Sequence, residues 1–332
     1  MIKTWDEIKD LGWSNLLLGN GFSTNIWNKY SYKSLHDYSI ANKVEPILNE
    51  NIQEIFSKLN TINFEEVLKA LAYAIIVKTA MGEDTEEYLK LYATVQRNLF
   101  NTVHAVHVDF KNVKKAEICL EIKQFEKVFT TSYDLILYWS AFEQIGAKTS
   151  ADFFWNDNSS FELYNSELDA DKSISFYYLH GALHLQQDLN GIVSKISGTA
   201  KTLPSETSFK YRGSKTKVPM FISEGTSEYK LNKIKSNSYL DFCYTNFSQI
   251  DDSLVVVGHS LDENFDDHLV QAIVKNTKLN RVAISIYSAL SVEEKNKLAQ
   301  TLTARLYREN LEVIFFESSS YPLINESVKV QA

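Results

Sequence analysis

The fold class is decided by one short segment near the amino terminus, residues 15–24, which reads NLLLGNGFST. An apolar run of strand type is followed at once by two glycines in the turn Gly-Asn-Gly at residues 19–21. Glycines after a buried strand suit a tight turn that brings backbone close to a ligand, although an ordinary strand-to-helix turn has the same pattern. Ser23 or Thr24 is placed to cap a following helix. This segment therefore predicts a strand, a glycine turn and a helix, which is typical of parallel α/β folds.

Beyond this unit the chain changes character twice. Apolar residues recur at helical spacing from about residue 45 to residue 126, and we find no convincing strand there. Strand patterns return after that block, and strands and helices alternate cleanly from residue 218 to residue 316. Alternation of this kind predicts a parallel sheet with helices on both faces. The expected strands are residues 127–131, 175–179, 192–196, 218–222, 253–257, 281–287 and 312–316, and the expected helices are residues 133–145, 227–247, 264–276 and 292–309.

Composition and charge exclude several classes of protein. The chain has 332 residues, of which 44% are hydrophobic and 23% charged, as in globular proteins. Its net charge of -8 lacks the basic footprint of a general nucleic-acid binder, and we interpret the basic stretch at residues 199–217 as a solvated loop. Two cysteines are too few for a disulfide framework or a four-cysteine zinc ribbon. The longest apolar run, residues 70–77, is too short to cross a membrane. We therefore expect a cytoplasmic protein that binds neither nucleic acid nor membrane.

A second group of polar residues follows the expected strand at residues 127–131. The segment 129–134 reads FTTSYD, so hydroxyl side chains end a strand and Asp134 falls in the first turn of a helix. Small polar groups at the carboxyl edge of a parallel sheet are where ligands bind. Helix capping by Thr131 or Ser132 is the simpler explanation of this segment taken alone.

Two more expected strands end in polar residues. His180 closes one and precedes Gly181, a position that suits either a base near neutral pH or a structural hydrogen bond. His184 lies four residues later, but the acidic residue of the His-Glu-x-x-His zinc motif is missing, so we expect no metal. Residues 258–260, GHS, follow another strand without the second glycine of a hydrolase nucleophile elbow.

Taken in order, these segments resemble the motifs of the sirtuin-like NAD-binding superfamily, and more closely those of the sirtuin-like NAD hydrolases of bacterial anti-phage defence. Residues 19–23 are similar to the family's Gly-Ala-Gly-x-Ser loop, and residues 130–134 to its Thr-Thr-Asn-Tyr-Asp. His180 with Gly181 matches its His-Gly, and residues 258–268 resemble its Gly-x-Ser and Asp-x-His stretch. The resemblance covers roughly residues 11–316, and its specificity comes from having all the motifs in order.

The resemblance implies a fold and a set of site residues. The fold is one domain over residues 1–332, with a Rossmann-like nucleotide-binding core at residues 11–44 and 125–317 and a helical insertion at residues 45–126. The substrate is NAD, and no metal is implied. Position 132 is Ser where the family has Asn, and Ser is shorter and lacks the planar amide. The implied catalytic residues are His180, Ser132 and Asp134, and the implied nucleotide contacts are Gly19, Asn20, Gly21, Phe22, Ser23, Thr131, Tyr133, Gly258, His259, Ser260 and Asp266.

We therefore expect an NAD(+) glycohydrolase that yields nicotinamide and ADP-ribose and depletes NAD as an effector of abortive infection. NAD depletion is toxic and the chain shows no obvious second sensor domain, so control is expected from a regulatory protein partner or from homo-oligomerisation. Two alternatives stay open. One is a non-catalytic module that binds NAD or ADP-ribose and signals through a partner, which Ser132 favours. The other is a different nucleotide N-glycosidase or an ADP-ribosyl transferase on the same fold.

Overall fold

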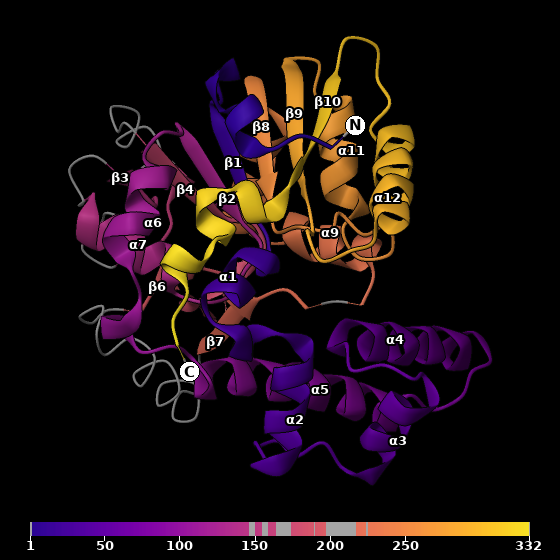
Figure 1. Ribbon diagram of the computed structural model, residues 1–332. Helices are drawn as coiled ribbons and strands as arrows, with labels where there is room; N and C mark the ends of the chain where they lie inside the picture. The colour runs from indigo at the N-terminus through magenta and orange to yellow at the C-terminus, as the bar shows by residue number, and fades with distance from the viewer. Residues whose placement is uncertain are drawn as a thin grey trace.

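A seven-stranded parallel sheet forms the centre of the computed structural model, with strand order β10-β9-β8-β1-β2-β4-β3 (Figure 1). Helices lie on both of its faces, so the predicted Rossmann-like α/β class is confirmed. The structure describes residues 2–145, 150–154, 159–163, 174–188, 190–196, 217–223 and 225–331. The strands of this sheet are β1 (Asn15–Leu18), β2 (Lys127–Thr130), β3 (Ser150–Ala151), β4 (Ile174–Tyr178), β8 (Asp252–Val257), β9 (Leu279–Ile286) and β10 (Glu312–Glu317).

The first strand is the centre of the sheet. All four residues of β1 are buried, as expected for a strand covered on both faces. It pairs in parallel with β2 on one side and with β8 on the other, with Leu18 opposite both Thr130 and Val257. Three strands that are distant in sequence therefore end side by side at one edge of the sheet.

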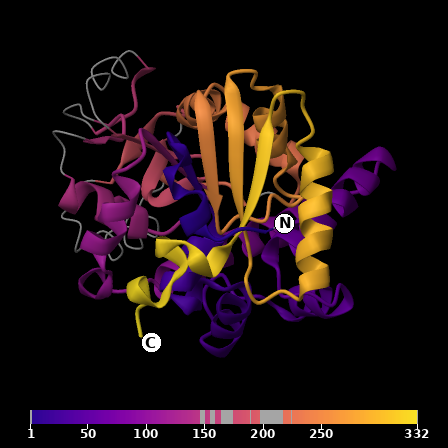
Figure 2. The same ribbon diagram turned by 45° about the horizontal axis from the view of Figure 1, so that its top comes forward.

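Adjacent aromatic residues on β4 show how the two faces are covered. Neighbouring strand residues point to opposite faces, and the ring of Phe176 meets Phe142 of α7 (Ile136–Gln144) at 5.7 Å. Tyr177 instead lies 6.0 Å from Phe242 of α10 (Ser238–Ser248). Figure 2 shows α12 running alongside the last strands of the sheet. The other helices of the core are α1 (Asn20–Ile26), α6 (Lys115–Ile122), α9 (Ser227–Lys235), α11 (Asp267–Lys275) and α12 (Val292–Arg305).

A helical module lies beside the carboxyl edge of the sheet (Figure 1). The structure describes all of residues 45–126, and none of them is in a strand, which confirms the predicted helical block. Both boundaries of the block differ from the predicted ones. The module begins earlier, with α2, which packs on α5 through a hydrogen bond of 2.8 Å from Ser39 to Asn98. It also ends earlier, because α6 packs on α7 of the core. The module consists of α2 (Tyr32–Ala41), α3 (Glu50–Lys58), α4 (Phe64–Ala80) and α5 (Glu86–Ala105).

The expected strand at residues 218–222 was wrongly assigned to the parallel sheet, and the expected strand at residues 192–196 also lies outside it. β6 (Val193–Lys195) and β7 (Lys217–Phe221) pair antiparallel with β5 (Gly181–Asp188), a strand that the sequence pattern did not reveal. The three form a separate sheet, because the chain turns away from the core at Gly181. Gly181 has a φ of 76°, and a Cβ there would lie 2.2 Å from the carbonyl oxygen of Met220. The pairing direction of these strands depends on contacts between residues that are distant in sequence, and it produces no local sequence pattern.

One expected helix is in fact two. The predicted helix at residues 227–247 is broken between α9 and α10 by Asn237. The side-chain oxygen of Asn237 accepts hydrogen bonds from the backbone N–H groups of Tyr239 and Leu240, which caps the second helix. The predicted basic loop at residues 199–217 lies outside the described residues except for Lys217, which opens β7.

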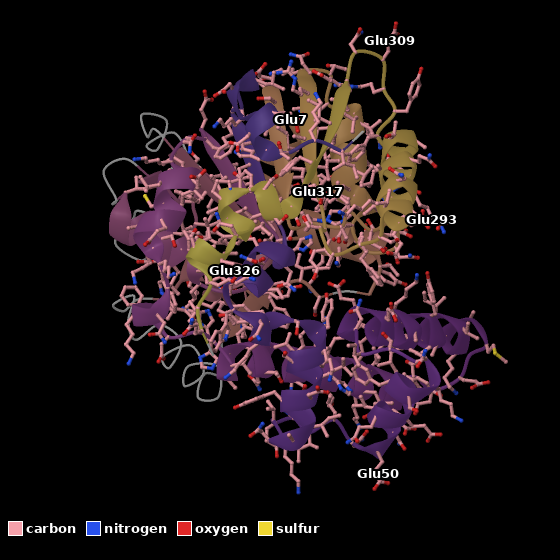
Figure 3. All side chains as sticks on the ribbon, in the orientation of Figure 1. Glu7, Glu50, Glu293, Glu309, Glu317 and Glu326 are labelled. Carbon is pink, nitrogen blue, oxygen red and sulfur yellow. The ribbon has the colours of Figure 1, made fainter. Side chains whose placement is uncertain are left out.

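Acidic side chains are spread over the outer surface. Figure 3 shows Glu50 at the far end of the helical module and Glu309 at the opposite end of the molecule. The labelled glutamates therefore extend from one end of the molecule to the other in this view. Among the helices of the described ranges, none is long and apolar enough to cross a membrane.

Candidate functional site

The carboxyl ends of β1, β2, β4 and β8 border a cleft of about 380 Å³. The helical module closes it on the other side with α4 and α5 residues such as Glu65 and Leu99. Three predicted contacts do not line the cleft: Gly19, Phe22 and Ser23. Of these, Phe22 and Ser23 are buried. The predicted site residues that line the cleft are Asn20, Gly21, Thr131, Ser132, Tyr133, Asp134, His180, Gly258, His259, Ser260 and Asp266.

The two glycine turns touch each other. Gly21 N–H donates to the Gly258 carbonyl at 2.8 Å, and a Cβ on Gly21 would lie 2.8 Å from the Gly258 Cα. A Cβ on Gly258, whose φ is 65°, would lie 2.4 Å from the Phe22 nitrogen. The glycines are thus required by contact between the two turns, and close approach to a ligand is not needed to explain them. The predicted cap by Ser23 or Thr24 is wrong, because α1 begins at Asn20 with Gly19 as its N-cap.

Ser132 lines the cleft, and its buried hydroxyl has no hydrogen-bond partner among the described residues. The predicted capping role of Thr131 or Ser132 is wrong, because α7 begins at Ile136 and Asp134 Oδ1 accepts the Ile136 N–H at 2.8 Å. Ser132 is only 6% exposed, and its Oγ has no hydrogen-bond partner among the residues that the structure describes. A buried polar atom left open in this way is a ready contact for a bound ligand or water.

Asp134 is held at the back of the cleft. Its Oδ2 accepts a hydrogen bond of 2.5 Å from Ser23 Oγ, which joins the first glycine turn to the segment after β2. Burial raises the pKa of Asp134, and the hydrogen bonds from Ser23 and Ile136 oppose that rise. The sequence motifs placed both residues in one site, and the structure brings them into contact.

His180 enters the cleft from the end of β4. It is 3% exposed, and its Nε2 lies 3.2 Å from Nε2 of His268 on α11. Burial lowers the pKa of His180 well below its ordinary value, and Lys230 and His268 lower it further. Burial also lowers the pKa of His268 to about 4, although Asp266 opposes the shift. His180 is therefore uncharged at neutral pH, as a base or a neutral hydrogen-bond partner must be.

A buried lysine in the cleft was missed by sequence reasoning. Lys230 on α9 is 1% exposed, and its Nζ lies 3.0 Å from Glu65 and 3.2 Å from Asp266. Burial opposes its charge, but the two carboxylates outweigh burial and raise the pKa of Lys230. Lys230 holds the pKa of Asp266 below its usual range, against the effect of burial. Local sequence carries no signal for this network, because it forms only where α4 meets α9.

The cleft is acidic on balance. Lys230 is the one lysine or arginine among its described lining residues. The carboxylic acids that line it are Glu65, Glu66, Asp134, Asp262 and Asp266. Such a lining favours a ligand that carries or develops positive charge.

Three side chains near His180 have the donor types of a metal site. One ring nitrogen each of His180 and His268 and one carboxylate oxygen of Asp266 lie within 4.8 Å of one another. However, Asp266 is paired with the Lys230 ammonium, which repels a cation. The group fits a hydrogen-bonded histidine pair better than a metal centre. His184 is not part of it, because its ring stacks on Tyr138 at 4.4 Å.

Comparison with known proteins adds a family. Residues 16–323 match the family described as "Domain of unknown function (DUF4917)". The chain belongs to the DUF4917 family. No curated protein matches it. Among solved structures, this DUF4917 protein is similar to one described as "Structural Basis for the Mechanism and Regulation of Sir2 Enzymes", with 10% identity, coverage of 88% of this chain and 91% of that chain, and a TM-score of 0.32. A likeness this remote gives no information on activity, so a function must be sought in the cleft of the DUF4917 protein itself.

Proposed function

We propose that this DUF4917 protein is an NAD(+) glycohydrolase that releases nicotinamide and leaves ADP-ribose. One observation carries the proposal: the buried His180 and Ser132, whose hydroxyl has no partner among the described residues, line the same cleft at the carboxyl edge of the sheet. Ligands of open α/β folds bind at this edge. The order of the motifs along the sequence, which resembles that of sirtuin-like NAD hydrolases, supports NAD as the ligand.

The charge of the cleft supports this chemistry. Cleavage of the bond between nicotinamide and ribose passes through an oxocarbenium-like state, as in glycoside hydrolysis. The nicotinamide ring of NAD is positive before cleavage, and the ribose becomes positive during it. Glu66 and Asp262 line the cleft and favour both charges.

We assign separate roles to the two central residues. Ser132 would hold the attacking water through its free hydroxyl, and the water would occupy the space that the family's longer Asn fills. His180 would take the proton that this water loses. Asp134, fixed by Ser23, would hold the ribose end of the site in place.

The biological role rests on the sequence resemblance. We propose that the protein depletes NAD as an effector of anti-phage defence, and that a regulatory protein partner or self-association restrains it until infection. The proposed cytoplasmic location and the proposed regulatory partner are inferred from that role, and the geometry of the cleft does not bear on them.

A second candidate is a non-catalytic module that binds NAD or ADP-ribose and signals through a partner. The observation that favours it is Ser132, which cannot supply the planar amide of the family's Asn. The two candidates differ in whether the bound nucleotide is cleaved.

The test is incubation of the purified protein with NAD, followed by chromatography for free nicotinamide, with and without the proteins encoded beside it. Nicotinamide should appear with the wild type and not with His180→Ala, while His180→Ala keeps its fold and much of its ADP-ribose binding. His36→Gln, a histidine of the helical module outside the cleft lining, serves as the matched control and should retain the wild-type rate. Nucleotide binding by the wild type without any nicotinamide release, in every partner combination, would replace the hydrolase with the binding module.

A further inference from the structure

Behind His180, a line of hydrogen bonds leads through the protein to a second hollow. His180 Nε2 lies 3.2 Å from His268 Nε2, and His268 Nδ1 lies 3.0 Å from Ser227 Oγ. His180 borders the cleft, whereas His268 and Ser227 border a separate hollow of about 850 Å³ beside α9, α10 and α11. Both rings are buried and Ser227 is half-buried. The three side chains thus connect two hollows with different lining residues.

One arrangement of hydrogens satisfies every bond in this line. Ser227 Oγ already accepts the backbone N–H of His268 at 2.7 Å. If it also accepts Nδ1–H of His268, its own hydrogen is free to point into the hollow. His268 Nε2 is then an acceptor for Nε2–H of His180, and Nδ1 of His180 keeps a lone pair. No described residue is a hydrogen-bond partner of that Nδ1, so it remains available to the cleft.

We propose that His180, His268 and Ser227 form a proton path that carries the proton released by NAD hydrolysis from the cleft to the second hollow. The proposal rests on the proposed function. In that reaction the water oxygen bonds to the anomeric carbon of the ribose. The electron pair of the broken C–N bond goes to the nicotinamide ring, which leaves neutral, and one proton of the water remains.

The path moves this proton in three steps. His180 Nδ1 takes it from the water, and the Nε2 proton of His180 passes to His268. The Nδ1 proton of His268 then passes to Ser227, whose own hydrogen goes to water in the hollow. After the products leave, a proton from water in the hollow returns along the line, and His180 Nδ1 releases its proton to water in the open cleft. This restores the starting tautomers, so the path removes the proton from the cleft during the reaction and returns one after product release. Only His180 touches the reacting atoms, so His268 and Ser227 are positioning residues that act through it.

The charges around His268 suit a transient proton. Asp266 favours a positive charge on the ring, as does Asp267, which is itself paired with Arg305 at 2.9 Å. Lys230 and His259 oppose that charge, and burial opposes it more strongly. A proton on His268 is therefore stabilised too little to remain there.

The test replaces His268 and then supplies an imidazole from solution. In His268→Ala, nicotinamide release should fall about 100-fold, in line with the loss of a proton-transfer partner, while KM for NAD stays unchanged. Added imidazole can enter, through the hollow, the space that the His268 ring leaves empty, and it should restore the rate. Substituted imidazoles should restore the rate in the order of their pKa values. His268→Gln should be as slow as His268→Ala and guards against misfolding of the smaller variant. Tyr244→Phe removes a hydrogen bond to the His268 carbonyl and should keep the wild-type rate without any response to imidazole.

A His268→Ala rate within threefold of wild type, or a slow variant that imidazole does not rescue, overturns the path and leaves the hydrolase standing. If the wild type releases no nicotinamide at all, the proposed function fails, and nitrogen-15 NMR of the imidazoles decides on the path. Hydrogen on Nε2 of His180 and on Nδ1 of His268 supports it, and the opposite tautomers overturn it. One equivalent of a divalent metal that is retained by the wild type and lost in His268→Ala also overturns it.

Discussion

Ser132 shows how far a motif can be interpreted without a structure. The sequence placed it after a strand among other hydroxyl residues, and N-capping of the next helix was the simpler explanation. In the structure α7 begins only at Ile136, with Leu135 as its N-cap. Asp134 accepts the Ile136 N–H, and the buried Ser132 hydroxyl has no partner among the described residues. Nothing local distinguishes which of several consecutive polar residues will cap, because that depends on where the helix begins.

Substitution of Ser132 should separate activity from stability. Ser132→Ala removes no hydrogen bond to a described residue, so the free energy of unfolding should change by less than about 0.5 kcal/mol. Nicotinamide release should fall at least about 10-fold, and Ser132→Asn should keep or raise it. Enzyme kinetics and urea unfolding measure the two effects.

Ser140→Ala is the matched control for that experiment. It removes a buried hydrogen bond of 2.8 Å to the Ile136 carbonyl on the same helix. Stability should fall by about 1 kcal/mol with activity unchanged. A Ser132→Ala protein that is destabilised yet fully active would contradict the role given to Ser132.

The histidine pair should make stability depend on pH. Burial holds the pKa of folded His268 at about 4, while the unfolded chain takes up a proton near its ordinary value of about 6.5. The unfolded state therefore binds more protons in this window, and stability falls as the pH drops from about 6.5 towards 4, by up to about 3 kcal/mol from this residue.

Urea unfolding at pH 7 and at pH 4.5 measures that loss. His268→Gln cannot take up the proton, so its loss between the two pH values should be smaller than that of the wild type. Equal losses in the two proteins would mean that burial of His268 does not control its protonation.

At the scale of elements, the cleft depends on contacts between backbones. The turns after β1 and β8 meet at Gly21 and Gly258, and the helical module is joined to the core by the buried Lys230 network. The glycines in the sequence predicted the two turns. The sequence analysis explained these glycines by a nearby ligand or by an ordinary strand-to-helix turn, whereas the structure explains them by contact with the opposite turn.

Gly21→Ala should force the two turns apart. The added Cβ would lie 2.8 Å from Gly258 backbone atoms, which cannot move without disturbing β8. We expect a loss of about 2–4 kcal/mol in the free energy of unfolding, with NAD binding lost as well. Gly82→Ala is the control, because Gly82 has a φ of 72° but nothing within 4 Å, so it should cost only about 1–2 kcal/mol. Equal losses at the two positions would show that the turn contact is unimportant.

Lys230→Met should destabilise the protein more strongly than loss of an exposed lysine. It leaves the Glu65 and Asp266 carboxylates buried without a cation, which costs about 3–5 kcal/mol. Lys90→Met breaks the exposed pair with Glu86 and should cost less than about 1 kcal/mol. Urea unfolding compares the two, and Glu65→Gln added to Lys230→Met should recover part of the loss. If the double variant is no more stable than Lys230→Met, the buried charge on Glu65 is not the cause.

At the scale of the whole molecule, local periodicity was enough for the parallel sheet and for the helical block. It failed for β5, β6 and β7, because whether two strands pair parallel or antiparallel depends on the path between them, as at Gly181. In the site, ordered motifs located Ser132, His180 and the turns. Lys230 could not be found, since its partners come from elements that are distant in sequence and meet only in the folded chain.

The strand order also bears on how the protein emerges during synthesis. β1 is synthesised long before β8, yet half of its hydrogen-bond ladder is supplied by β8, which ends at Val257. The second glycine turn, Asp266 and His268 come later still. A nascent chain that has not yet reached His268 therefore has neither a closed cleft nor a paired His180. Under the proposed function, such a chain cannot destroy NAD, and the danger to its own cell begins only after β8 and His268 have joined the fold.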